Sequence, residues 1–198
     1  WFETAFNKKD IYLNERKRID ENPWKGQPVI IVDIDDVLAS FRAGFAKWLS
    51  ETRDIHPDIE STEYYFIDSL KNSGENPEQI FEDFMKEDGF LYLGIVKDAV
   101  AFLKKLKEIG CWVHLLTARP EENLDCFYAT YQWLSDNSIP FDDLSFSSEK
   151  FRWCAQSQYY DKQSIVFAID DSPKHAIEYA THGINVKVPY KSYNKQNS

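Results

Sequence analysis

Short apolar runs alternate with amphipathic stretches along most of the chain. The run at 29–32, four β-branched residues in a row, is typical of a fully buried strand of a parallel sheet. Because helical patterns separate this run from the others, the alternation predicts an α/β fold with a doubly wound parallel sheet. The further strands are expected at 112–116, 144–146, 165–169 and 185–188.

Helical periodicity and capping signals describe the segments between the strands. Asn76, Pro77 and Gln79 are typical of an N-cap, a first-turn proline and a capping-box glutamine. Gly110 is expected to follow the end of another helix. The spacing predicts helices at 8–21, from 41, from 77, from 98, at 122–135, at 150–160 and at 174–181. The apolar positions expected to face inward are Phe41, Phe45, Trp48, Leu49, Ile80, Phe81, Phe84, Met85, Val100, Phe102, Leu103 and Leu106.

The order of these elements divides the chain of 198 residues into three parts. Residues 1–28 are expected to be an N-terminal helical extension. The α/β alternation occupies 29–40 and 95–198, and 41–94 form a small helical insertion after the first strand. The first residue is Trp1 rather than Met, which leaves open a signal or transit segment upstream.

An acidic cluster follows the first strand directly. Asp33 and Asp35 lie two apart, so their side chains project to the same side if the backbone is extended. Two close carboxylates repel unless a cation or a proton lies between them. The pair therefore indicates a metal site, a nucleophile with an acid/base partner, or both. The simpler interpretation is that these residues only end a strand and open a turn.

Two other predicted strands also end in polar residues, namely Thr117 and the pair Asp170-Asp171. The carboxyl ends of neighbouring parallel strands meet in one crevice, where α/β sheets bind ligands. Carboxylates, a hydroxyl and nearby cations are the groups that magnesium-dependent phosphoryl transfer requires. An aspartate can itself attack phosphorus and form an aspartyl-phosphate.

Composition restricts the partners. A net charge of −10 argues against a non-specific nucleic-acid binder, which needs a basic face. A small phosphorylated substrate is still compatible, because a metal and a few cations can reverse the field inside one cleft. Cys111, Cys126 and Cys154 have no zinc or disulfide spacing, so a reducing, cytoplasmic location is expected. No apolar run reaches the ~18 residues of a membrane span.

These motifs, in this order, resemble the haloacid dehalogenase (HAD) superfamily of phosphatases. The resemblance covers 29–189 and includes an apolar strand with Asp33-Ile34-Asp35-Asp36-Val37, then Leu115-Leu116-Thr117, a lysine, and Asp170-Asp171. It implies magnesium as cofactor, with Asp33, Asp35, Asp170 and Asp171 at the metal, Asp35 through its backbone carbonyl. Family dehalogenases lack the second aspartate, so Asp35 favours a phosphatase.

The resemblance also implies catalytic roles. Asp33 would be the nucleophile, Asp35 the acid that protonates the leaving group and then the base that activates water, and Thr117 a hydrogen-bond donor to the phosphoryl group. Lys150 is favoured as the motif lysine, with Lys162 as the alternative. The fourth position of the first motif, often glycine in relatives, is Asp36 here, a residue type that tolerates unusual backbone conformations.

The segment that begins Val37-Leu38-Ala39-Ser40-Phe41 is similar to the 5′(3′)-deoxyribonucleotidase branch. In this superfamily an insertion between the first two motifs is a cap that selects the substrate, and 41–94 would be that cap here. The substrate is expected to be a nucleotide or a similar small phosphate ester. Phe41, Phe45 and the aromatic residues at 64–66 could stack on a base or pack the cap. Ala118 and Arg119 are the remaining candidate substrate contacts, although Arg119 could instead pair with Glu121 or Glu122.

The sequence is also compatible with two alternatives to a nucleotidase. The segment 168–188 is similar to the 3′-phosphatase part of phage polynucleotide kinase-phosphatases, which would make the activity nucleic-acid end healing. The chain could also be a catalytically idle member of the fold that binds a phosphorylated ligand or a protein. His175 is expected to be a polar surface group and His114 a core histidine.

Overall fold

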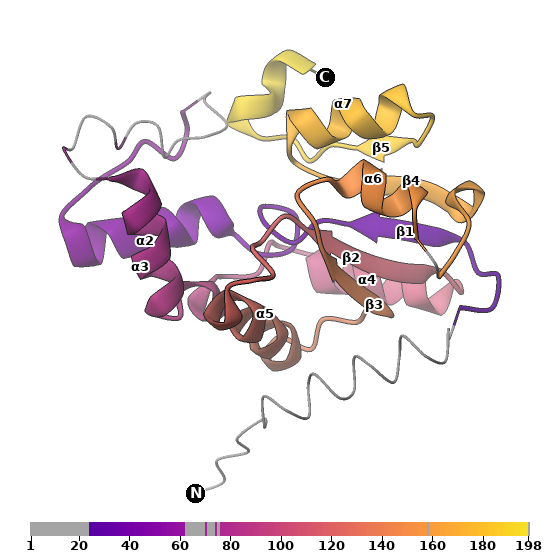
Figure 1. Ribbon diagram of the computed structural model, residues 1–198, viewed down its shortest axis with the longest axis horizontal. Coiled ribbons are helices and arrows are strands. Elements are labelled where there is room, and N and C mark those ends of the chain that lie inside the picture. The colour runs from indigo at the N-terminus through magenta and orange to yellow at the C-terminus, as the bar shows by residue number, and fades with distance from the viewer. Residues whose placement is uncertain (1–23, 62–69, 71–73, 75, 158, 198) are drawn as a thin grey trace, which may run out of the picture.

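Five parallel strands form one sheet in the centre of the protein (Figure 1). The computed structural model describes residues 24–61, 70, 74, 76–157 and 159–197. The strand order β3-β2-β1-β4-β5 confirms the predicted doubly wound α/β fold. The strands are β1 (Val29–Val32), β2 (Trp112–Thr117), β3 (Asp143–Phe146), β4 (Ile165–Ile169) and β5 (Val186–Lys187).

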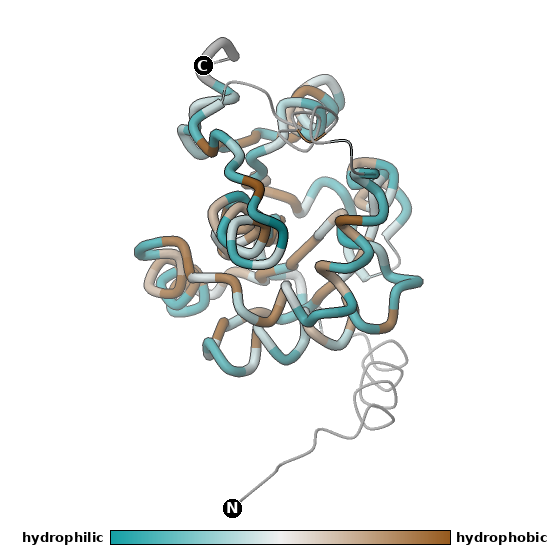
Figure 2. Tube along the Cα trace, turned by 90° about the vertical axis from the view of Figure 1, so that its left-hand side faces the viewer, coloured by the Kyte–Doolittle hydropathy of each residue, from teal (hydrophilic) through white to brown (hydrophobic). Residues whose placement is uncertain are grey.

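Helices cover both faces of the sheet because β1 is apolar on both sides. Alternate side chains of a strand point to opposite faces. Ile30 and Val32 pack in the cluster that includes residues of α4 (Ala99–Glu108) and α5 (Leu124–Asp136). Val29 and Ile31 pack in the cluster that includes residues of α6 (Lys150–Ala155) and α7 (Pro173–Thr181). Figure 2 shows that the helical turns of the described chain carry both apolar and polar residues.

The insertion after β1 lies beyond one end of the sheet (Figure 1). It contains α2 (Phe41–Arg53), α3 (Pro77–Lys86) and the 3₁₀ helix η2 (Gly89–Tyr92). Six aromatic residues pack together there, and this cluster is continuous with the core on the α4–α5 face of the sheet. These six residues are Phe41, Phe45, Trp48, Phe81, Phe84 and Phe90. The insertion is therefore anchored by aromatic packing to the body that carries the sheet.

Most predicted elements are confirmed, with three local corrections. Gln79 makes no capping box but donates a hydrogen bond to Asp83 one turn later. Phe102 is 43% exposed, because the buried face of α4 consists of Ala99, Leu103 and Leu106. Helix α6 ends at Ala155 rather than at residue 160. The chain leaves the helix there, and Tyr160 packs in the same core cluster as Val29 and Ile31.

The remaining short helices are η3 (Lys162–Ser164) and η4 (Ser192–Asn197). The predicted helix at 8–21 and the aromatic residues at 64–66 lie outside the described residues. Within the part of the chain that the structure describes, no helix combines the length and apolarity needed to cross a membrane. All three cysteines are free and buried.

Candidate active site

The loop after β1 presents the first acidic motif. The backbone N–H of Asp33 donates to the carbonyl of Ile169 at 2.9 Å, which ties the loop to the end of β4. Asp36 has a φ of 54°, the left-handed conformation that its position in the motif suggested. Its carboxylate accepts a hydrogen bond from the backbone N–H of Arg42 at the start of α2. The loop is therefore held at both ends.

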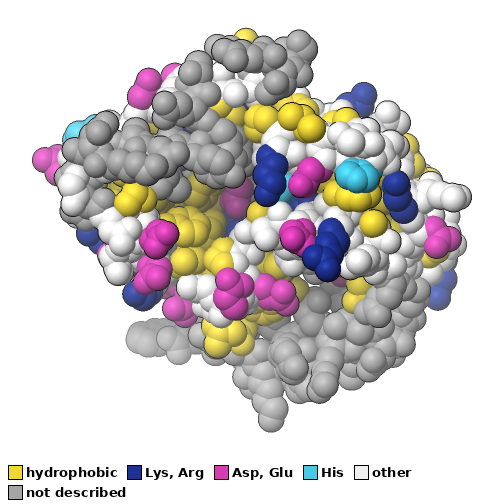
Figure 3. All heavy atoms as spheres, turned by 45° about the horizontal axis from the view of Figure 1, so that its top comes forward, with side chains coloured by type: hydrophobic (Ala, Val, Ile, Leu, Met, Phe, Trp, Pro, Cys, Tyr) yellow, Lys and Arg dark blue, Asp and Glu magenta, His cyan; other side chains and the backbone are white. Residues whose placement is uncertain are grey.

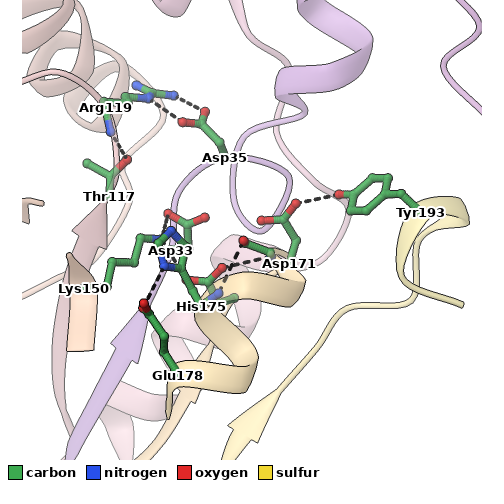
Figure 4. Close-up of polar contacts among 11 residues, drawn as sticks. Asp33, Asp35, Thr117, Arg119, Lys150, Asp171, His175, Glu178 and Tyr193 are labelled. Atoms are coloured by element: carbon green, nitrogen blue, oxygen red, sulfur yellow. Dashed lines mark hydrogen bonds and ion pairs between the residues drawn. The ribbon is translucent and has the colours of Figure 1, made fainter. Parts of the chain in front are cut away.

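Three carboxylates converge at the carboxyl ends of β1 and β4 (Figure 4). Asp33, Asp170 and Asp171 are all buried, and one carboxylate oxygen from each lies within 4.8 Å of the other two. Lys150, at the first turn of α6, forms ion pairs with Asp33 at 2.8 Å and Asp170 at 2.7 Å. Lys162 instead donates to the carbonyl of His182, away from this cluster. The structure thus brings Lys150, and not Lys162, to the acidic motifs.

Burial shifts the proton affinities of this cluster. It raises the pKa of Asp33 to about 6, an effect that the charge of Lys150 opposes. Burial likewise raises the pKa of Asp171 well above its ordinary value, with the charge of Asp33 adding to the shift. Burial lowers the pKa of Lys150, but the two carboxylates outweigh it and the net pKa lies above the ordinary value. Lys150 therefore stays protonated, and the cluster still favours a further positive charge.

The residues present fit a magnesium ion. Three buried carboxylates with one lysine provide an excess of negative charge, and all of the candidate ligand atoms are oxygen, which magnesium prefers. Asp35 does not contribute its carboxylate to the cluster, because that group is bound elsewhere. The metal role that the resemblance gives Asp35, through its backbone carbonyl, stays a prediction.

Arg119 binds the second motif aspartate through both carboxylate oxygens. Its Nε donates to Asp35 at 2.9 Å and its Nη2 at 2.7 Å. The guanidinium also donates to Thr130 and lies 4.0 Å from the centre of the Phe90 ring. The expected alternative, an ion pair of Arg119 with Glu121 or Glu122, is therefore wrong, because the guanidinium pairs with Asp35. The guanidinium is buried, whereas those two glutamates are exposed.

A cavity of about 220 Å³ opens over these groups. Figure 3 shows apolar side chains along one wall of a hollow, with charged side chains behind them. Phe41, Phe81 and Phe90 line the cavity from the insertion, and Ala118 lines it as well. Phe45 is fully buried and does not line it, because its ring stacks between Phe41 and Trp48. Other lining residues include Asp33, Asp35, Arg119, Lys150 and Asp171.

Two predicted site residues lie behind the cavity wall. Thr117 is fully buried at the end of β2, and its hydroxyl accepts a hydrogen bond from the backbone N–H of Arg119. Asp170 is 1% exposed, and its second carboxylate oxygen accepts a hydrogen bond from the backbone of Ser172 at the start of α7. Both residues therefore support the wall that Asp33 and Arg119 form.

The sequence interpretation missed several residues at the cavity, including Phe81 and Phe90 from the insertion. His175 lines the cavity and is buried, not a surface group; burial and the charge of Lys150 lower its pKa. Its place in the first turn after Asp171-Ser172 could have indicated this. Tyr193 and Arg42 also line the cavity, and no local pattern marks either of them. His114, by contrast, is fully buried and hydrogen-bonded as predicted.

A parallel sheet in this order, with paired acids, a lysine and a threonine at its carboxyl edge, together with the family match that follows, indicates a phosphatase of the HAD superfamily, a hydrolase of phosphoric monoesters. The family model described as "5′ nucleotidase, deoxy (Pyrimidine), cytosolic type C protein" matches residues 27–197. The chain belongs to this nucleotidase family. No curated protein matches the chain.

Solved structures agree with this fold. A hydrolase from Streptococcus pneumoniae TIGR4 is 16% identical, with a TM-score of 0.53 over 87% of this chain and 98% of that one. A Bacillus subtilis protein described as a HAD hydrolase and solved with magnesium is 15% identical, with a TM-score of 0.59 over 82% and 88%. A Clostridium difficile protein described as a phosphatase is 15% identical, with a TM-score of 0.60 over 88% and 91%. At these identities the likeness concerns the fold alone.

Proposed function

We propose that this protein hydrolyses the phosphomonoester of a nucleotide with magnesium as cofactor and an aspartyl-phosphate intermediate on Asp33. The observation that carries the proposal is the buried ion-pair cluster of Asp33, Lys150 and Asp170. Asp33 and Lys150 from this cluster line a cavity together with Asp35. Magnesium bound by Asp33, Asp170 and Asp171 would supply positive charge that offsets the charge of the phosphoryl oxygens.

Two displacements at phosphorus account for the reaction. A carboxylate oxygen of Asp33 attacks phosphorus, the bond to the ester oxygen breaks, and that oxygen takes a proton from Asp35. Water then loses a proton to Asp35 and attacks the phosphorus, which releases phosphate and frees Asp33. Lys150 stabilises the carboxylate of Asp33 in the resting state and after its release. Thr117 is proposed to donate its hydroxyl hydrogen to the phosphoryl group, because its bond with Arg119 uses the hydroxyl oxygen only as an acceptor.

The nucleotide part of the proposal is supported by the walls of the cavity and by the family. Phe41, Phe81 and Phe90 offer aromatic surfaces above the charged groups, and a nucleobase stacks on such surfaces. We propose that 41–94 act as the cap that carries these contacts, and that the protein acts in the cytosol as its family description states.

The direct test is phosphate release, with and without magnesium, from 5′- and 3′-mononucleotides, sugar phosphates and a 3′-phosphorylated oligonucleotide. The expected result is magnesium-dependent release that is fastest from a mononucleotide. A preference for the oligonucleotide would support end healing instead. Absence of magnesium-dependent release from every substrate would contradict the enzymatic proposal and favour an idle, ligand-binding member of the fold.

Arg119→Gln is expected to lower kcat by about 100-fold, within the range that a positioned acid/base group contributes. Both oxygens of Asp35 are bound by Arg119, so the guanidinium sets where this carboxylate can exchange a proton. Steady-state kinetics with the preferred nucleotide would measure the change. Arg53→Gln, which breaks an arginine–aspartate pair on the insertion, is the matched control. An equal loss in both variants would contradict the assigned role.

A further inference from the structure

The segment that follows β5 returns to the active site. Tyr193, in η4, is buried, and its hydroxyl donates to the Oδ2 atom of Asp171 at 2.6 Å (Figure 4). The figure shows the carboxylate of Asp171 between this hydroxyl and Asp33. A residue far from every recognised motif thus contacts a member of the acidic cluster directly.

Several contacts hold this segment in place. The amide of Asn194 donates to the carbonyls of Asp171 at 3.4 Å and Pro189 at 2.7 Å. Ser192 donates to the carbonyl of Ser61 on the insertion. The position of the Tyr193 hydroxyl is therefore fixed from both the core and the insertion.

The ring of Tyr193 is fixed as well. The guanidinium of Arg42 lies 4.9 Å from the ring centre, a cation–π distance. Arg42 is itself anchored, since its Nε donates to the carbonyl of Ile59 at 2.7 Å and its Nη2 to that of Ser61 at 3.0 Å. Tyr193→Phe would remove only the hydroxyl and leave the packing of the ring intact, so this variant isolates the hydrogen bond to Asp171.

The Tyr193 hydroxyl supplies a hydrogen-bond donor to the one carboxylate of the acidic cluster, that of Asp171, with which Lys150 forms no ion pair among the described residues. Lys150 binds Asp33 and Asp170. Among the described residues, Tyr193 is the side chain that donates to the carboxylate of Asp171. A hydrogen bond to one oxygen fixes the orientation of a carboxylate, and such outer contacts tune metal affinity.

We propose that Tyr193 is a positioning residue that orients Asp171 for the metal ion, which makes the C-terminal segment a part of the active site. This inference rests on the proposed function, because it assumes that the acidic cluster binds magnesium. It extends that function by assigning a role to a residue outside the sequence motifs.

The test compares the full chain with Tyr193→Phe by calorimetric titration with magnesium chloride and by thermal unfolding at increasing magnesium concentration. The expected result is a magnesium dissociation constant about 10-fold higher in the variant, a typical effect of losing an outer-shell partner. The melting temperature without metal should be close to that of the wild type. Saturating magnesium should restore most of kcat. Tyr190→Phe, on an exposed tyrosine of the same segment, is the control.

The outcomes separate this inference from the proposed function. Equal magnesium affinity in wild type and Tyr193→Phe would overturn the positioning role and leave the phosphatase proposal intact. A lower melting temperature without metal, combined with unchanged affinity, would show a structural role only and would also overturn it. Failure of the wild type to bind magnesium at all would overturn both the cofactor assignment and this inference.

Discussion

Asp33→Asn is expected to reduce turnover by about 10⁴-fold or more, the scale seen when a catalytic nucleophile is removed. Asparagine keeps the shape and an oxygen that accepts from Lys150, but its amide cannot form the acyl-phosphate bond. The fold should be retained. One of three crowded carboxylates is lost, so the melting temperature without metal should stay equal or rise. Phosphate release and thermal unfolding measure the two parts of this prediction.

A labelling experiment makes the nucleophile assignment sharper. Wild-type protein quenched in acid during turnover of a ³²P-labelled substrate should carry label on the peptide that contains Asp33, and Asp33→Asn should carry none. Asp54→Asn is a matched control, because Asp54 is an exposed aspartate at the end of α2. Substantial turnover in Asp33→Asn, or label on another residue, would contradict the assignment.

The sequence predicted those candidate site residues that lie at the ends of strands. Asp33, Thr117 and Asp170 each come directly after a run of apolar residues, and parallel pairing brings the ends of β1, β2 and β4 to one edge. Local periodicity also predicted the first helix of the insertion. These features depend on neighbours in the chain, which a sequence displays.

Contacts between distant elements could not be predicted in this way. Arg119 has two glutamates close to it in sequence, yet it binds Asp35, 84 residues away, because burial of the guanidinium favours a fully bound partner. Phe41 and Phe45 share one helix face, but tertiary packing puts only Phe41 on the cavity wall. Tyr193 reaches the site through the path of the chain after β5, which no pattern encodes.

Lys150→Met is expected to lower the free energy of unfolding of the metal-free protein by about 3–5 kcal/mol at pH 8, the usual effect of removing one partner of a buried ion pair. The lysine is 1% exposed and bridges Asp33 and Asp170, so its loss leaves like charges together without compensation. Urea unfolding would measure the change. Lys162→Met, which alters the alternative motif lysine on the surface, should have little effect.

The same variant should show a pH dependence that identifies the cause. Lys150 is protonated throughout pH 5–8 because its pKa lies above the ordinary lysine value, so its own titration contributes nothing in this window. The carboxylates do titrate there, since burial raises the pKa of Asp33 to about 6 even with the lysine present. Protonation at pH 5 relieves their repulsion, so Lys150→Met should be less destabilised at pH 5 than at pH 8.

Magnesium should restore part of the stability that Lys150→Met loses at pH 8, because the ion supplies the missing positive charge. A destabilisation that is independent of both pH and magnesium would mean that Lys150 acts by packing alone.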